Sequence, residues 1–210
     1  MIKRFFQAAA LWLFVLSAAI ALTILGTFIL YPIDVHFLNI LDQSNVKVTF
    51  GQLYANFAQL MAYLHFPWVT TLHMTNFPVS VTGAIHFRDV KTLFLLDYAI
   101  LIVTAWPAWA YLRSLHRQHD TWRLYRQSLV ALAVPPLLAV LALMGFDQFF
   151  VTFHEILFRN SDWIFDPAKD PIITVLPEEF FAHTFFLAFI LLELFAGGLY
   201  WWARREMKRA

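Results

Sequence analysis

The sequence predicts an all-α integral membrane protein with four transmembrane helices and with amphipathic helices and loops that form a cap on the outer face. Three observations lead to this fold class. The 210 residues are 60% hydrophobic and only 14% charged, which exceeds what the core of a soluble domain requires. Four apolar stretches are long enough to cross a hydrocarbon core of about 30 Å. The basic residues are distributed unevenly among the segments that join these stretches.

The four spans are predicted at residues 11–30, 93–112, 129–146 and 185–203. The first span follows Lys3 and Arg4, but its apolar run is longer than that of a signal peptide, so we expect a retained anchor. No repeat or shift in composition marks a second domain. We therefore expect a single membrane domain over residues 1–210, with outer loops at 31–92 and 147–184.

The positions of the basic residues predict the orientation. Ten of the fifteen lie before the first span, between the second and third spans, or after the fourth. Lysine and arginine accumulate on the cytoplasmic side of membrane proteins. The other five lie in the two long loops, together with ten carboxylates. The sequence therefore predicts a cell-membrane protein with cytoplasmic N- and C-termini and with both long loops outside.

Both outer loops contain helical patterns. In the first loop, apolar residues recur at helical spacing at Leu53, Phe57, Leu60, Met61 and Leu64. The second loop opens with the aromatic run DQFFVTFHEILF, which places residues 149, 153, 156 and 157 on one helical face and residues 147, 150 and 154 on another. Pro177, followed by two glutamates, predicts the first turn of the last helix.

Two histidines of these loops lie at a similar predicted depth. The segment HFRDVK leads into the second span, and an early helix start puts His86 and Asp89 on one stripe. His154 follows the third span by eight residues. If the helices continue, both histidines lie on the order of 10 Å outside their spans, at the level of the lipid headgroups. A histidine at this level is either an acid–base group or an ordinary residue of an amphipathic surface.

Composition excludes several kinds of chemistry. The chain has no cysteine, which removes disulfides, thiolate metal sites and a cysteine nucleophile. A net charge of +1 provides no basic field for nucleic acid. The histidines and acids match no dedicated zinc motif, and we predict no metal site.

Four outer-face motifs together resemble a known family. They are HxxDVK, FHxxxFxNxxW, DPxxD and LPExFF, within the segments SVTGAIHFRDVKTLF and FDQFFVTFHEILFRNSDWIFDPAKDPIITVLPEEFF. On a four-span frame of this length, the set resembles the lipoprotein intramolecular transacylases of low-GC Gram-positive bacteria. The resemblance extends over essentially the whole chain.

The resemblance implies an enzyme that moves the sn-2 acyl chain of a lipoprotein's diacylglyceryl-cysteine to the α-amine of that cysteine. It implies no cofactor, because the substrate carries the nucleophile. His86 and His154 are then the expected base and acid, in either order, and Asp89 either orients His86 or stabilises its charged form. The candidate substrate contacts are Arg88, Lys91, Asn160 and Trp163. The expected partners are a diacylated lipoprotein and membrane lipid, with no nucleic acid, and we expect a monomer.

Two other classes of function stay open at this stage. A metal-dependent membrane hydrolase would use the histidines and the acids as ligands. A non-catalytic membrane sensor or assembly module would explain the four spans, but it gives no reason for two histidines at matching depth.

Overall fold

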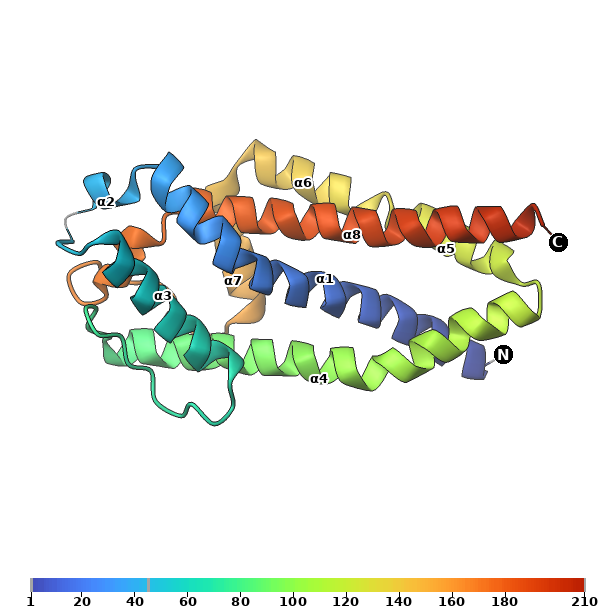
Figure 1. Ribbon diagram of the computed structural model, residues 1–210, viewed down its shortest axis with the longest axis horizontal. Helices are drawn as coiled ribbons and strands as arrows, with labels where there is room; N and C mark the ends of the chain where they lie inside the picture. Colours follow the sequence, from blue (N-terminus) through green and yellow to red (C-terminus); the bar gives the residue numbers. More distant parts are fainter. Residues whose placement is uncertain (1, 45, 210) are drawn as a thin grey trace. The chain divides into compact units, whose positions relative to one another are not determined.

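The computed structural model describes residues 2–44 and 46–209, and the regular structure of this part of the chain is helical, without a strand. The α-helices are α1 (Ile2–Phe37), α2 (Ile40–Gln43), α3 (Phe50–His65), α4 (Val81–Arg117), α5 (Thr121–Ala131), α6 (Val134–Met144), α7 (Phe146–Leu157) and α8 (Glu178–Met207) (Figure 1). A short 3₁₀ helix, η1 (Pro171–Val175), precedes α8. The predicted all-α class is confirmed.

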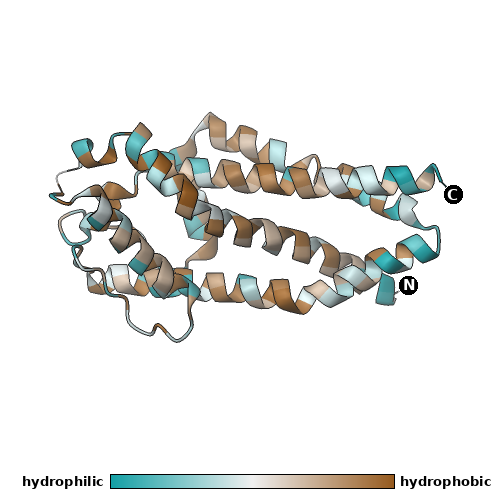
Figure 2. Cartoon of the chain, in the orientation of Figure 1, coloured by the Kyte–Doolittle hydropathy of each residue, from teal (hydrophilic) through white to brown (hydrophobic). Residues whose placement is uncertain are grey.

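Four helical segments of the described chain are long and apolar enough to cross a membrane: Lys3–Phe37, Val81–Arg117, Thr121–Met144 and Glu178–Met207. Each contains or largely overlaps one predicted span. Many of their large apolar side chains are exposed, such as Ile102 at 74% and Leu143 at 72%. Figure 2 shows hydrophobic residues over most of α6 and α8. Exposed apolar surface on this scale requires lipid as its solvent.

The third span differs from its predicted form. It was expected as one stretch over residues 129–146, whereas α5 ends at Ala131 and α6 begins at Val134. Pro135 and Pro136 follow at once. Because proline lacks a backbone N–H and fits the first turn of a helix, it starts a new helix here and interrupts the old one.

By its internal contacts the chain divides into two compact units. The first unit consists of Met1–Ile24, Asp97–Met144 and Phe185–Ala210, and the second consists of Leu25–Leu96 and Gly145–Thr184. Helices α1, α4 and α8 contribute residues to both. The prediction of a single membrane domain stays a prediction.

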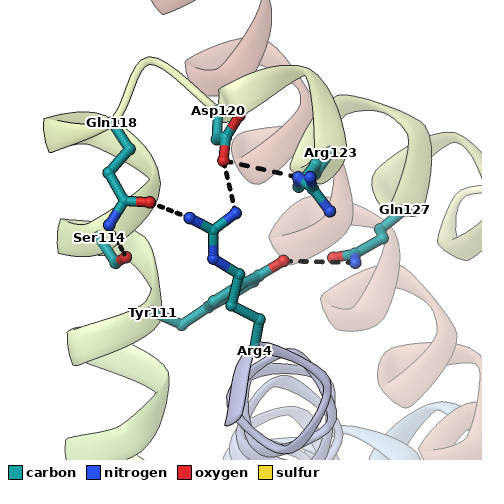
Figure 3. Close-up of polar contacts among 7 residues, drawn as sticks. All are labelled: Arg4, Tyr111, Ser114, Gln118, Asp120, Arg123 and Gln127. Carbon is teal, nitrogen blue, oxygen red and sulfur yellow. Dashed lines mark hydrogen bonds and ion pairs between the residues drawn. The ribbon is translucent and has the colours of Figure 1, made fainter. Parts of the chain in front are cut away.

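The first unit has an apolar core and one polar end. Its core includes Leu11, Tyr111 and Leu124. At the polar end Arg4 forms an ion pair of 2.7 Å with Asp120, and it also bonds Gln118 (Figure 3). Further contacts at this end join Arg123 to Asp120, Gln127 to Tyr111, and His116 to Glu206. The start of α1, the α4–α5 connection and the end of α8 therefore lie at the same end of the first unit (Figure 1).

The second unit is built around α3. Its predicted apolar stripe is confirmed, since all five of its residues are buried. Thr49 and Gln52 form a capping box that fixes where α3 begins. Tyr31 of α1 stacks on Phe57 with ring centroids 4.2 Å apart, and its hydroxyl donates to the carbonyl oxygen of Val175. These contacts pack α1, α3 and η1 together within the unit.

Candidate active site

The two predicted histidines meet in the second unit. His86 lies in the second turn of α4, which begins early, at Val81, as predicted. His154 lies near the end of α7. Their ring centroids are 5.9 Å apart, and the rings are tilted by 36°. Both residues are buried, with 7% and 8% of their surface exposed. The structure thus brings together two imidazoles that are 68 positions apart in the sequence.

Helix α7 buries His154 but exposes its other polar residues, which are Asp147, Gln148, Thr152 and Glu155. His154 is buried, whereas Ile156 is 76% exposed and Leu157 is 40% exposed. Both polar and apolar residues of α7 are therefore exposed, and the burial of His154 does not follow from an ordinary amphipathic pattern. Gly145 is the residue that precedes the first turn of α7.

A backbone contact fixes the tautomer of His154. Its Nδ1 lies 2.8 Å from the carbonyl oxygen of Phe150. A carbonyl oxygen only accepts, so Nδ1 carries the proton and donates it to this bond. In the neutral ring, Nε2 then holds the lone pair.

Burial also keeps the His154 ring neutral. It lowers the pKa of His154 below the ordinary value of 6.5, although the bond to Phe150 acts in the opposite direction. A neutral imidazole with a free lone pair at Nε2 is the form in which histidine acts as a general base.

His86 lies in an aromatic surrounding. Its ring centroid is 4.9 Å from that of Phe158 and 5.4 Å from that of Phe165. Its Nδ1 is buried and has no hydrogen-bond partner in the described part of the chain. A buried polar atom without a partner costs about 1–3 kcal/mol, and such atoms mark functional sites more often than ordinary cores.

A chain of contacts joins Asp89 to the ring of His154. Asn160 donates from Nδ2 to Oδ2 of Asp89 at 3.0 Å, and the indole nitrogen of Trp163 donates to the carbonyl oxygen of Asn160 at 3.0 Å. The indole ring then packs on His154, with centroids 4.9 Å apart. No hydrogen bond joins Asp89 to His86 in the described chain, so Asp89 acts on His86 only through its charge.

The two predicted cations near His86 have different surroundings. Arg88 is exposed. Lys91 is buried and donates from Nζ to the carbonyl oxygens of Phe66 (3.0 Å) and Val69 (2.5 Å). Its ammonium also lies 4.4 Å from the ring centroid of Tyr63. Lys91 therefore binds the segment that leaves α3, and Arg88 is the cation with an accessible head.

The first turn of α4 has a buried carboxylate that sequence reasoning did not assign to the site. Asp170, only 1% exposed, accepts from the Ser80 backbone nitrogen at 2.7 Å and from the Ser80 hydroxyl at 2.5 Å. The Ser80 hydroxyl in turn accepts from the Gly83 nitrogen. A β-carbon at Gly83 would overlap the Asp170 carboxylate. Serine is a residue type that often precedes a helix, but nothing in the sequence shows that its partner is Asp170, 90 positions away.

The aromatic side chains around the two histidines were also not predicted as site residues. Phe150 and Phe165, which contact the histidines, belong to predicted helix or loop segments rich in phenylalanine. Phe150 was placed on the helical face of His154 but was not assigned to the site, and with 23 phenylalanines in the chain nothing in the sequence distinguishes Phe165. In the described residues no group of three or more histidines and acids is arranged to hold a metal ion.

Comparison with known proteins gives a consistent result. The family model described as lipoprotein intramolecular transacylase Lit matches residues 5–181. A solved structure of the membrane-integral lipoprotein intramolecular transacylase Lit from Bacillus cereus is 28% identical, covers 99% of this chain and 97% of its own, and superposes with a TM-score of 0.88. A search of curated proteins found no match.

Two further solved structures are variants of the same Bacillus cereus protein in which one histidine is replaced by arginine or by alanine. Each is 28% identical, covers 99% of this chain and 93% or 94% of its own, and has a TM-score of 0.79. The family model covers most of the chain, and the structural likeness covers nearly all of it. The chain therefore belongs to the lipoprotein intramolecular transacylase Lit family.

Proposed function

We propose that this transacylase moves the sn-2 acyl chain of a diacylglyceryl-cysteine lipoprotein to the α-amine of the same cysteine. The amine nitrogen attacks the ester carbonyl, a C–N bond forms, and the C–O bond to the glycerol breaks. The amine gives up one proton, and the glycerol oxygen gains one. The products are an amide and a free glycerol hydroxyl, so no water, nucleotide or second substrate takes part.

The observation that carries the proposal is the close pair of buried imidazoles at His86 and His154. The reaction needs a base for an amine whose pKa is about 7.7–8.0 and an acid for the departing alkoxide. We assign the base to His154, because its Nδ1 is held by the backbone and its Nε2 is left with the lone pair. The proton that His154 takes from the amine passes to His86, which delivers it to the glycerol oxygen, so both rings end the reaction neutral.

Five other residues take supporting roles in the proposal. Asp89 contributes charge beside His86, and Asn160 and Trp163 hold the ring of His154 in place through their mutual contacts. The exposed guanidinium of Arg88 is suited to the oxyanion or to the lipid headgroup. Lys91 acts indirectly, because it binds the backbone of the segment that leaves α3.

The proposed orientation places the N- and C-termini in the cytosol and the histidines on the outer side, where a lipidated cysteine is displayed. The ten basic residues that flank the spans on one side support it. The reacting partners are then a diacylated lipoprotein and the lipid around it. We propose that the monomer is sufficient, since both histidines come from one chain.

The test is positional labelling. A diacylglyceryl lipopeptide that carries a heavy acyl chain only at sn-2 is incubated with the purified protein, and the product is fragmented in a mass spectrometer. We expect unchanged total mass, with the heavy chain on the α-amine and a free hydroxyl on the glycerol. An N-acetylated lipopeptide is the control, because its amine is blocked, and it should remain unchanged.

Three results would contradict the proposal. Transfer of the sn-1 chain would refute the positional assignment. Release of free fatty acid from both lipopeptides would identify a hydrolase. Loss of activity with EDTA and its recovery with zinc would favour the metal-dependent alternative.

A further inference from the structure

The first unit contains a groove that the transacylase site does not use. It has a volume of about 470 Å³ and is lined almost entirely by apolar side chains of α1, α4 and α8. Leu11 of α1 forms part of its floor, while Trp109 of α4 and Leu194 of α8 are partly exposed beside it. This volume lies within the range of about 300–1,000 Å³ that is typical of small-molecule sites.

The groove is open because its lining residues are small at critical positions. Ala105 and Ala108 line it from α4, and Gly198 lines it from α8. A β-carbon at Gly198 would meet no atom within 4 Å. Glycine there is not needed for helix packing, and its absent side chain leaves the groove unfilled.

Two arginines, Arg113 and Arg205, lie further along the helix faces that line the groove. The guanidinium of Arg113 lies 5.1 Å from the ring centroid of Trp109, one turn earlier on α4. On α8, Trp201 and Arg205 continue the stripe of Gly198 at i+3 and i+7, and the guanidinium of Arg205 lies 5.3 Å from the Trp201 ring centroid. Each side therefore ends in a cation stacked on a tryptophan.

Neither of these arginines has a carboxylate partner in the described chain. Arg4 and Arg123 share Asp120, and Arg209 pairs with Glu206. Arg113 and Arg205 are exposed and keep their charges uncompensated. A strictly topological role requires only a positive charge on the correct side of the membrane. It does not require two such charges beside an unfilled apolar groove.

We propose that this groove binds one anionic phospholipid of the surrounding membrane. One acyl chain occupies the apolar groove, and the phosphate lies between the guanidiniums of Arg113 and Arg205. The tryptophans hold the arginine heads at the level of the membrane interface. A zwitterionic lipid fits the groove equally well but gains less from the two positive charges. The site is separate from the histidine pair, and its occupancy does not depend on the proposed reaction.

The test is a lipid titration of the purified, delipidated protein, followed by native mass spectrometry. Phosphatidylglycerol and phosphatidylcholine with identical acyl chains are compared. We expect tighter binding of phosphatidylglycerol. In the double variant Arg113→Gln/Arg205→Gln its affinity should fall roughly 25-fold, at about fivefold for each charge near a phosphate, and phosphatidylcholine binding should change little.

Two further variants separate the groove from general charge. Arg126→Gln/Arg204→Gln removes the same number of exposed charges from outside the stripes, and it should keep the preference for phosphatidylglycerol. Gly198→Leu fills open space, so it should fold normally and weaken the binding of both lipids. The proposal is overturned if the wild type shows no preference, if the two arginine pairs have equal effects, or if Gly198→Leu binds both lipids as the wild type does.

Discussion

His86 and His154 illustrate how far single residues could be predicted. Their similar depth followed from helical rise, and the structure brings their rings together. Asp89 was expected either to orient His86 from the same helical face or to stabilise its charged form, and its hydrogen bond is accepted from Asn160, which lies 71 positions away. Spacing along one helix predicts which face a side chain occupies. It does not reveal a partner that a distant loop supplies.

Buried histidines should make the stability of the protein depend on pH. Burial lowers the pKa values of His65 and His154 below 6.5 in the folded state, whereas the unfolded chain binds these protons at about 6.5. Stability should therefore fall as the pH decreases below about 6.5, because the unfolded state binds more protons there. His154→Gln should make this dependence shallower.

The measurement is the midpoint of thermal unfolding in detergent as a function of pH between about 5 and 7.5. His73, which is exposed, provides the matched control as His73→Gln and should leave the dependence unchanged. An unchanged pH dependence in His154→Gln would show that the folded-state pKa of His154 is not lowered.

The contact between Gly83 and Asp170 predicts a large effect from one methyl group. Gly83→Ala places a β-carbon against the Asp170 carboxylate, which has little room to move because both its oxygens bind Ser80. Overpacking of this kind typically costs about 1–3 kcal/mol. The loss should appear in the free energy of unfolding and in the acyl-transfer rate, since α4 also carries His86.

Gly51 is the matched control for Gly83. It is also helical, but a β-carbon there meets nothing within 4 Å. Gly51→Ala should therefore be neutral or should stabilise α3 by up to about 1 kcal/mol through helix propensity alone. Equal effects of the two substitutions would refute the steric account.

Secondary-structure elements were predicted best where one pattern determined them. The stripe of α3 and the first turn of α8 were both located from the sequence, and α7 occupies the predicted aromatic run. The interruption between α5 and α6 was missed, because apolar composition alone does not show where a backbone hydrogen bond is lost to Pro135 or Pro136. The inward direction of His154 was also not visible from periodicity, which cannot tell a lipid-facing side from a core-facing one.

The segment between α3 and α4 depends on polar anchors rather than on regular structure. Asn56 and Asn76 form two hydrogen bonds, and Gln59 and Thr75 form two more. Lys91 binds the start of the segment. Lys91→Met keeps most of the apolar stem but leaves two carbonyl oxygens without their donor. Hydrogen exchange of peptides within residues 66–80 should therefore become faster.

This experiment distinguishes two roles of Lys91. If it contacts only the substrate, exchange should stay unchanged and only the KM for the lipopeptide should rise. The exposed Lys47, changed to Met, is the control and should affect neither quantity.

For the whole molecule, the sequence predicted four membrane-spanning helices, and the described residues contain four helices that are long and apolar enough to cross a membrane. The orientation of these helices in the membrane is supported only by composition, that is, by the ten-to-five division of the basic residues. Within the first unit, the polar contacts of Arg4, Asp120 and Glu206 place the start of α1, the α4–α5 connection and the end of α8 at one end. Four crossings of the membrane likewise require both termini to lie on the same side.

Single cysteines test the orientation directly, because the chain has none of its own. Cysteines at Ser44 and Ser161 should react with an impermeant thiol reagent in intact cells, and one at Ser114 should react only after the cells are opened. Labelling at Ser114 in intact cells would reverse the proposed orientation.

The central claim is that His86 and His154 form one catalytic unit, and the most direct test is the rate of N-acylation of a diacylglyceryl lipopeptide by folded single and double variants. Each His→Ala change should lower the rate by about 10²- to 10⁴-fold, and the double variant should be scarcely slower than the worse single, because residues that act together lose activity non-additively. Asp89→Asn should cost less than either. The claim would be contradicted if the two losses multiplied in the double variant. It would also be contradicted if either alanine variant retained more than about a tenth of the rate, since acid–base catalysis typically contributes more than that.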